Sequence, residues 1–216
     1  MQPKTLDHVA FWVADREPLV ELATTRLGMH VIDRQEAFTL VGSDARRGKL
    51  TFFAAEGPRE RGALKHVAVR VSRLDGGPKE LELGEGVRVR VVEASTDVDY
   101  DLDHVALYSH DPERTAQEYL RLGFNAAEPA PGGEPRVEVG GAYVEFHHGE
   151  PGDPERPVLN HLAVLVDSAD RHIEEAEELG IVDNVVDAAN TRAVFVWGPE
   201  RVRIEYVEHK PEFALQ

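Results

Sequence analysis

Two glutamates and two histidines are the residues of this 216-residue chain whose types and spacing could do chemistry. Glu145 and Glu205 each interrupt an apolar run, "AYVEF" and "VRIEYV", of the kind that forms a buried strand. His104 and His161 precede them by 41 and 44 residues. A buried carboxylate without a partner is unstable, so each glutamate must face a cation or a metal ion. Two imidazoles with two carboxylates are typical ligands for divalent Fe, Mn, Co, Ni or Zn, and we expect one such ion.

The absence of cysteine narrows this metal chemistry. With no thiolate available, any metal must be held by histidine and carboxylate side chains. The alternative is a purely structural role, in which the histidines pack in the core and the glutamates form ion pairs with Arg203 and its neighbours.

Both histidines belong to a five-residue motif that occurs four times. "LDHVA" stands at 6–10 and again at 102–106, and the related "LKHVA" and "LNHLA" stand at 64–68 and 159–163. An alternating apolar run follows each copy, which predicts a strand. Helix signals follow three of the strands, at 16–28, 111–123 and 168–180, each ending in glycine. Further short apolar runs complete each unit of about 50 residues.

These repeats predict an α+β fold of four tandem βαβββ modules, of which the second, between 64 and 98, lacks room for a full helix. A unit of this size buries too little surface alone and must pair with another. We expect consecutive units to pair, giving an amino-terminal domain at 1–98 and a carboxyl-terminal domain at 99–216.

The amino-terminal half is expected to be degenerate. His8 and His66 occupy the motif position of His104 and His161. Their last-strand counterparts are taken to be Phe52 and Arg90, an apolar ring and a cation that cannot complete a metal site. His8 and His66 are therefore predicted to be structural, and the metal is predicted to lie in the carboxyl-terminal half.

The repeated module, the histidine of its first strand and the closing "GPERVRIEYVE" resemble the vicinal-oxygen-chelate superfamily. That superfamily includes glyoxalase I, extradiol ring-cleavage dioxygenases, epimerases and bleomycin-resistance proteins. The resemblance implies paired modules whose curved mixed sheets form a cup, with metal ligands on the first and last strands. By this likeness His104, Glu145, His161 and Glu205 are the metal ligands.

Other polar residues are assigned to the same cup by strand alternation. His147 shares a face with Glu145 near the rim, and both are candidate catalytic residues, His147 as a general base. Its alternative is an exposed histidine at a strand end. Tyr108, Tyr143 and Arg203 are candidate substrate-binding residues.

Three functions remain open from the sequence. The first is an isomerase or lyase of the glyoxalase type, in which the metal binds two adjacent substrate oxygens; the four-ligand set favours it. The second is an extradiol Fe(II) dioxygenase using His104, His161 and Glu205. The third is a ligand-binding protein without metal chemistry, like the bleomycin-resistance members. We expect an enzyme and place the isomerase or lyase first.

Composition limits the partners. The net charge of −16 disfavours nucleic acid and anionic membranes, which are bound by basic surfaces. No run of about 18 apolar residues is present. We therefore expect a cytoplasmic protein with a small-molecule substrate, no nucleic-acid or membrane partner, and a homodimer as one assembly to test.

Overall fold

A computed structural model describes residues 1–43, 48–74, 76 and 79–211, and within them the chain forms fifteen strands and three α-helices. Unit one contains β1 (Thr5–Val13), α1 (Arg16–Arg26), β2 (His30–Arg34), β3 (Phe38–Gly42) and β4 (Lys49–Ala54). Unit two contains β5 (Leu64–Val71), β6 (Glu80–Gly84) and β7 (Val87–Glu93). Unit three contains β8 (Asp101–Ser109), α2 (Pro112–Arg121), β9 (Asn125–Ala126), β10 (Arg136–Val139) and β11 (Ala142–His148). Unit four contains β12 (Leu159–Leu165), α3 (Ala169–Leu179), β13 (Val182–Asp187), β14 (Thr191–Trp197), a 3-10 turn η1 (Pro199–Arg201) and β15 (Arg203–His209).

All three predicted helices form, beginning within one residue of the predicted start and ending one or two residues before the predicted glycine. The side chains of Asp15, Asp111 and Ser168 each accept a hydrogen bond from a backbone N–H in the first turn. The third helix ends at Gly180, whose positive φ of 68° stops the helix at low cost. The α+β modular fold is therefore confirmed. Unit two has three strands, and its described residues contain no helix. No helix in the described part of the chain is long and apolar enough to cross a membrane.

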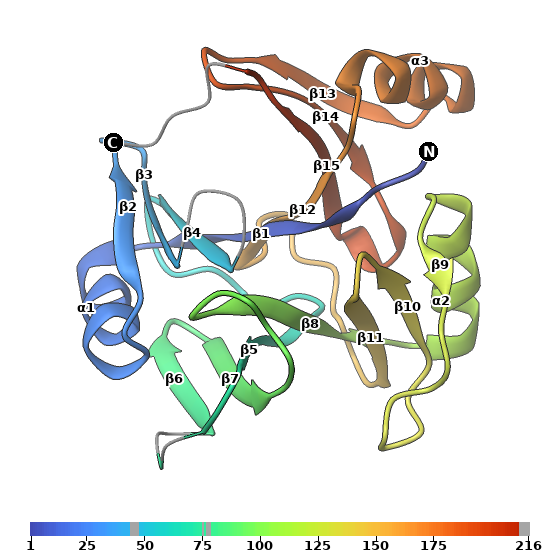
Figure 1. The fold of residues 1–216 in the computed structure, drawn as a ribbon. Coiled ribbons are helices and arrows are strands. Elements are labelled where there is room, and N and C mark those ends of the chain that lie inside the picture. The colour runs from blue at the N-terminus through green and yellow to red at the C-terminus, as the bar shows by residue number, and fades with distance from the viewer. Residues whose placement is uncertain (44–47, 75, 77–78, 212–216) are drawn as a thin grey trace.

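The units pair differently from the expected order (Figure 1). Units one and four form an eight-stranded mixed sheet, the first sheet, in the order β13-β14-β15-β12-β1-β4-β3-β2. Units two and three form a seven-stranded mixed sheet, the second sheet, in the order β6-β7-β5-β8-β11-β10-β9. The expectation that units three and four share one cup was therefore wrong. The boundary at 98/99 falls between two strands of the second sheet, and its status as a domain boundary stays a prediction.

The five-residue motif has a direct structural meaning at the centre of the first sheet. There β1 and β12 pair antiparallel, so that His8 lies opposite Ala163 and His161 lies opposite Ala10. The small alanine of one copy leaves room for the imidazole of the other. The second sheet repeats this arrangement between β5 and β8.

The variable second letter of each motif lies at a β-bulge. In the first sheet the pairing skips Asp7 and Asn160, and in the second sheet it skips Lys65 and Asp103. A bulge redirects a side chain that would otherwise alternate to the opposite face. Neighbouring side chains of a regular strand point to opposite faces, but the bulge lets those of Asp7 and His8 meet. Oδ2 of Asp7 lies 2.8 Å from Nδ1 of His8.

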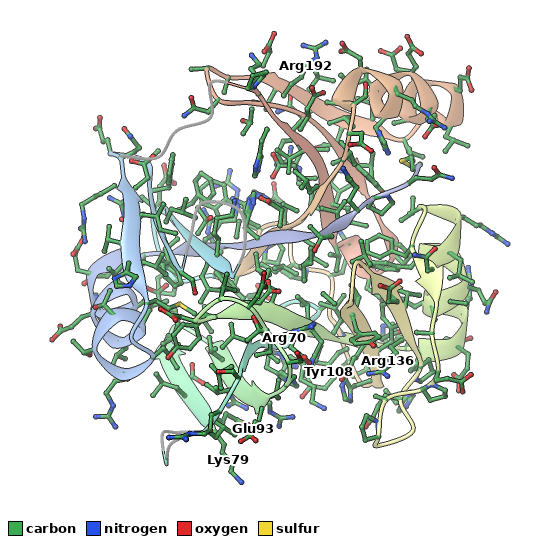
Figure 2. All side chains as sticks on the ribbon, in the orientation of Figure 1. Arg70, Lys79, Glu93, Tyr108, Arg136 and Arg192 are labelled. Atoms are coloured by element: carbon green, nitrogen blue, oxygen red, sulfur yellow. The ribbon has the colours of Figure 1, made fainter. Side chains whose placement is uncertain are left out.

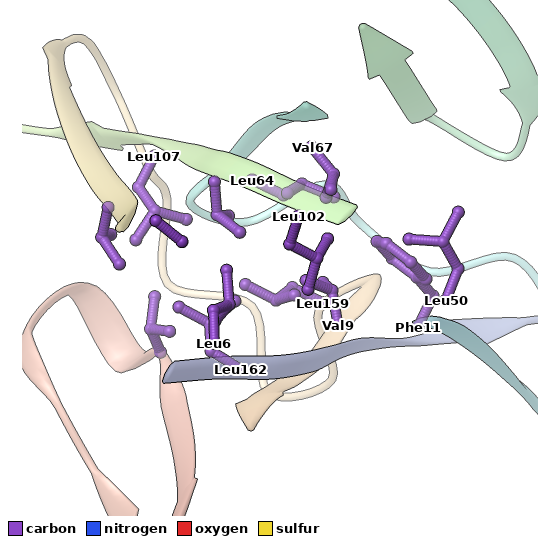
Figure 3. Packing of buried hydrophobic residues seen from close by; sticks show 14 of the residues in the cluster. Leu6, Val9, Phe11, Leu50, Leu64, Val67, Leu102, Leu107, Leu159 and Leu162 are labelled. Carbon is purple, nitrogen blue, oxygen red and sulfur yellow. The ribbon is translucent and has the colours of Figure 1, made fainter. Parts of the chain in front are cut away.

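The two sheets share one hydrophobic core (Figure 3). Leu6 and Leu162 of the first sheet contribute to the same buried cluster as Leu64 and Leu102 of the second. The bulge at the second letter places each motif leucine on the strand face opposite its histidine, and Leu162, the residue after His161, also lies there. The core therefore fixes the histidines of both sheets on faces that point away from each other.

Replacing Leu102 by alanine should destabilise the whole molecule in one step. Leu102 is 1% exposed in the core between the sheets, so we expect a loss of about 2–5 kcal/mol in the free energy of unfolding. Because the core is continuous, chemical denaturation should show a single transition. Leu179→Ala, at a side chain that is 59% exposed, is the control and should change stability by about 0.5 kcal/mol or less. Two separate transitions would instead support independent domains at 1–98 and 99–216.

Asp7 offers a second test, because this fully buried carboxylate faces buried Lys49 with an Oδ2–Nζ distance of 3.0 Å. Burial alone would raise the pKa of Asp7, but Lys49 and hydrogen bonds from His209 and His8 hold it well below its ordinary range. Asp7→Asn should therefore cost about 3–5 kcal/mol at neutral pH. The difference from wild type should stay constant above about pH 5 and shrink below about pH 4, because the carboxylate of the unfolded wild-type chain then begins to bind protons while the native one stays ionised.

The control for Asp7 is Asp167→Asn, which removes the exposed ion pair with Lys4. That pair is solvated on both sides, so we expect a change of less than about 1 kcal/mol. Thermal melts across the pH range measure both variants. Equal melting temperatures for Asp7→Asn and wild type at neutral pH would contradict the stabilising role of the buried pair.

Candidate metal centre

Three side chains of the first sheet converge on one point. The Nε2 atoms of His8 and His161 lie 3.0 Å apart, and Oε2 of Glu205 lies 3.3 Å from the first and 3.1 Å from the second. His8 comes from β1, His161 from β12 and Glu205 from β15, which are neighbouring strands at the centre of the sheet. Among the described residues, this is the group of histidine and carboxylate side chains able to hold a metal ion.

The outer nitrogens of both imidazoles are already engaged. Nδ1 of His8 lies 2.8 Å from Oδ2 of Asp7, and Nδ1 of His161 lies 3.1 Å from Oδ1 of Asn160. Since both partners are acceptors, we assign the proton of each neutral imidazole to Nδ1. Each Nε2 then presents a lone pair to the other and to Glu205. Metal-binding histidines are held in this way by an outer acceptor.

The donor separations fit a metal ion well. Two ligand atoms about 2.1 Å from one ion, at right angles, are separated by about 3 Å, whereas a tetrahedral angle gives about 3.4 Å. The observed separations of 3.0, 3.1 and 3.3 Å are close to one face of an octahedron. Three lone-pair donors facing one another without a cation would repel. The residues present therefore fit a divalent ion with two histidine ligands and one carboxylate.

Electrostatics favour the metal-binding protonation states of two of these groups. Burial would raise the pKa of Glu205, but His161 and His8 outweigh burial and hold the pKa well below its ordinary range. Burial lowers the pKa of His161, and Glu205 only partly offsets it. Burial would also lower the pKa of His8, but hydrogen bonds to Asp7 and Glu205 raise it. Protonation of His8 therefore competes with metal binding at this residue.

A large cavity, which we call the central cavity, opens onto the three donors. It has a volume of about 570 Å³, and its lining includes residues of β2 and β3 at one end of the sheet and of β14 at the other. The first sheet therefore curves around it. The wall combines apolar and polar side chains, among them Phe38, Leu40, Phe53, Gln35, Asn190 and Thr191. This size and mixture suit a small organic molecule.

His209 is a further polar group in the wall of the central cavity. It lies two alternations beyond Glu205 on β15, on the same face of the strand. Its Nε2 lies 3.2 Å from Oδ1 of Asp7, the carboxylate that holds His8. An imidazole in this position is suited to proton transfer with a bound molecule.

The four predicted metal ligands are divided between the two sheets. His161 and Glu205 lie in the first sheet and belong to the converging group. His104 and Glu145 lie in the second sheet, so a single site made of all four is not formed. The physical reason is the pairing of unit four with unit one, which brings His8 to His161 instead of His104. The expectation that His8 is merely structural does not agree with this geometry.

Strand register corrects the other expectation about unit one. The residue opposite the motif alanine is Glu205 in unit four and Glu145 in unit three. In unit one it is Thr51, which is one residue away from the expected Phe52. In unit two it is Arg90, as predicted. The first sheet thus combines one glutamate with a threonine at these equivalent positions.

The equivalent position in the second sheet has a different electrostatic character. Nε2 of His66 lies 3.0 Å from Nε2 of His104, and Oε2 of Glu145 lies 3.7 Å from the latter. Burial and the nearby Arg90 lower the pKa of His66 to about 2. Glu145 also lies 3.7 Å from a guanidinium nitrogen of Arg136. The surrounding cations favour the ion-paired interpretation of Glu145, although metal binding by His104 and Glu145 stays a prediction.

The remaining predicted site residues also lie mainly in the second sheet, where Figure 2 labels Tyr108 on β8 and Arg136 on β10. His147 contacts Glu145 at 3.7 Å and Lys65 at 2.9 Å. The ring of Tyr108 lies 4.5 Å from the guanidinium of Arg61, and that of Tyr143 lies 3.8 Å from that of Arg136. These side chains share their sheet with His104 and not with the converging group.

Arg203 lies in the first sheet instead. Its guanidinium pairs with Asp183 and covers the ring of Phe195 at 4.1 Å. The roles of Tyr108, Tyr143, His147 and Arg203 toward a substrate stay predictions.

Sequence reasoning missed His8 as a donor, the acceptors Asp7 and Asn160, and His209. The signal for the acceptors was present in the motif itself. Its second letter is aspartate or asparagine in three copies, and lysine only in the second. An acceptor beside the histidine fixes the imidazole proton on Nδ1, whereas the donor Lys65 does not accept it.

Comparison with known proteins establishes the fold. No protein-family profile and no curated protein sequence matches the chain. Glyoxalase I from Zea mays superposes with a TM-score of 0.71 at 14% identity, over 94% of this chain and 92% of that one. A Bacillus subtilis protein provisionally named a dioxygenase superposes with a TM-score of 0.73 at 13% identity, over 97% and 86%. The cppA protein from Streptococcus pneumoniae gives 0.61 at 13% identity, over 95% and 98%.

At these identities the likeness concerns architecture and leaves the reaction open. It covers both sheets, since almost the whole chain is superposed in each case. The chain therefore has the paired-module fold of glyoxalase I, as its repeats implied.

Proposed function

We propose that the protein is a divalent-metal-dependent enzyme whose ligands are His8, His161 and Glu205, and that its chemistry is that of an Fe(II) oxygenase of the extradiol type. The observation that carries this proposal is the facial arrangement of two imidazole nitrogens and one carboxylate oxygen, 3.0–3.3 Å apart. Two histidines and one carboxylate with open positions are the ligand set of non-haem Fe(II) oxygenases.

The division of the predicted ligands changes the order of the candidate reactions. The isomerase or lyase was favoured by a set of two histidines and two glutamates. In the first sheet the position equivalent to Glu205 is Thr51, so that one carboxylate remains. A three-donor centre leaves more of the coordination sphere to substrate and co-substrate, which supports the oxygenase.

The bound ion would act as a Lewis acid that binds two adjacent oxygens of a small substrate. The residues around it have separate tasks. Asp7 and Asn160 hold the two imidazoles with Nε2 toward the ion. Phe38, Leu40 and Phe53 give the central cavity an apolar wall that displaces water around the substrate. His209 is assigned to proton transfer at a substrate oxygen, the role predicted earlier for His147.

Removal of a donor should strip the metal. Purified protein should contain about one divalent ion per chain, and His8→Ala, His161→Ala and Glu205→Gln should each lower the content strongly, because each removes one of three donors. His104→Ala is the matched control, since it changes the same motif position in the second sheet, and it should leave the content unchanged. Elemental analysis measures the result. Loss of metal in His104→Ala with retention in His8→Ala would place the centre in the second sheet.

Metal binding should also depend on pH in a defined direction. The raised pKa of His8 means that a proton displaces the ion more readily as the pH falls. Added Fe(II), Mn(II), Ni(II) or Zn(II) should therefore raise the melting temperature of stripped protein at about pH 7.5 and raise it less at about pH 5. A melting temperature that no metal changes at either pH would favour a metal-free ligand-binding protein.

The reaction class is tested separately on Fe(II)-loaded protein. Oxygen uptake with a panel of catechols should exceed the uptake by Glu205→Gln protein, if the centre works as an oxygenase. Absence of uptake, together with metal-dependent isomerisation of a 2-hydroxy ketone panel, would establish the isomerase or lyase instead. His209→Gln should lower turnover without removing the metal, because His209 is assigned to proton transfer and not to ligation.

A further inference from the structure

A second cavity, which we call the side cavity, lies at another part of the same face of the first sheet. Its volume is about 330 Å³. Trp12 is four residues after His8 on β1, and Arg203 is two residues before Glu205 on β15, so both point to the face that carries the metal centre. Trp197 pairs with Arg203 on the neighbouring strand and also lines the cavity. None of these three lines the central cavity.

The aromatic wall of the side cavity contains both tryptophans of the chain. Trp197 is 44% exposed, which is unusual for so large an apolar surface, and its Nε1–H donates to Oδ1 of Asp183 at 2.9 Å. The hydrogen bond fixes the ring plane while a face stays accessible. Two indoles beside one cavity offer flat surfaces for a planar ligand.

Arg59 supplies a cation without a carboxylate partner among the described residues. Its guanidinium carbon lies 5.9 Å from the ring centre of Trp12, so the group sits at the aromatic wall. Its Nε is shielded from solvent and has no hydrogen-bond acceptor among the described residues. No ion pair of Arg59 with these residues is formed either. Leaving such a donor unsatisfied is costly, so an acceptor from a ligand would stabilise this arrangement.

The charge balance around the side cavity favours a monoanion. Arg203 is neutralised by Asp183, with an Nη2–Oδ2 contact of 2.5 Å. Arg59 and Arg156 then face one carboxylate, Glu155, which leaves one net positive charge in the lining. This positive region belongs to a protein with a net charge of −16, so the local field, and not the overall field, must attract an anion.

We propose that the side cavity binds a planar organic monocarboxylate, with its ring against the indoles of Trp12 and Trp197 and its carboxylate on the guanidinium of Arg59. A guanidinium can bind a carboxylate through two parallel hydrogen bonds. The volume of about 330 Å³ suits a molecule with a single aromatic ring. The site does not depend on the proposed metal, because none of its recognition groups is a metal donor.

The two tryptophans give this proposal a direct readout. Tryptophan fluorescence, excited where tyrosine does not absorb, is titrated with benzoate in protein as isolated and in protein treated with a chelator. We expect the same saturable change in both samples. Benzamide, which has the ring without the charge, should bind roughly tenfold or more weakly, and inorganic phosphate should compete poorly. Trp12→Phe and Trp197→Phe should each keep part of the signal.

Variants distinguish the site from non-specific binding. Arg59→Gln should weaken benzoate roughly tenfold to a hundredfold. Arg61→Gln is the matched control, because Arg61 covers Tyr108 of the second sheet, and it should bind as wild type. If circular dichroism shows that Arg59→Gln does not fold, the same titration is made with Arg156→Gln, because Arg156 also lines the side cavity. We then expect the affinity for benzoate to fall severalfold.

Three results would overturn the proposal. The first is no saturable fluorescence change with benzoate. The second is unchanged affinity in the folded arginine variant that decides the test. The third is binding that phosphate abolishes as efficiently as benzoate, or that disappears with the chelator, since it would then belong to a simple anion site or to the metal centre.

Discussion

The antiparallel contact between two copies of one five-residue motif is the constraint on which the rest of this structure depends. In each sheet the histidine of one copy lies against the alanine of the other, and the two imidazoles approach to 3.0 Å between Nε2 atoms. The leucine of the motif faces the opposite way, into the core shared by both sheets. The same letters therefore specify a core contact on one face and a pair of nitrogen donors on the other. Close packing of the core makes the donor positions rigid.

The two sheets share the same pairing of their central strands but differ in the charged residues beside the histidines. At the position opposite the motif alanine, the first sheet has Glu205 and Thr51, and the second has Glu145 and Arg90. In the second sheet the guanidinium of Arg136 lies near Glu145, and burial together with Arg90 disfavours protonation of His66. The charged residues around these positions thus give two geometrically similar histidine pairs different electrostatic surroundings.

The sequence was sufficient for the modules, the three helices and the fold, because these depend on local periodicity and on caps such as Ser168 and Gly180. It also pointed to His161 and Glu205, since a glutamate inside an apolar strand needs a partner. It could not show which units pair. All four first strands carry the same motif, so pairing unit four with unit one or with unit three satisfies the local pattern equally well.

The missed parts of the site have the same origin. His8 becomes a donor only through the pairing of unit one with unit four, and the counterpart of Glu205 shifts from Phe52 to Thr51 only when strand register is known. The bulges at Asp7 and Asn160 break the alternation on which sequence arguments rely. Such irregularities are set by contacts between distant strands and leave a weak local signal.

The nested order of the units, with two and three enclosed between one and four, has a consequence for how the molecule is made. Units two and three are adjacent in the chain, so their sheet can close as soon as residue 148 has left the ribosome. The imidazoles of His8 and His161 are separated by 153 residues, so their sheet closes only once unit four has been synthesised. Until then the edge of β1 that pairs with β12 has no partner. A closed inner sheet shortens the flexible chain between units one and four, which lowers the entropy cost of bringing them together. The order of synthesis therefore favours closure of the inner sheet before that of the outer one.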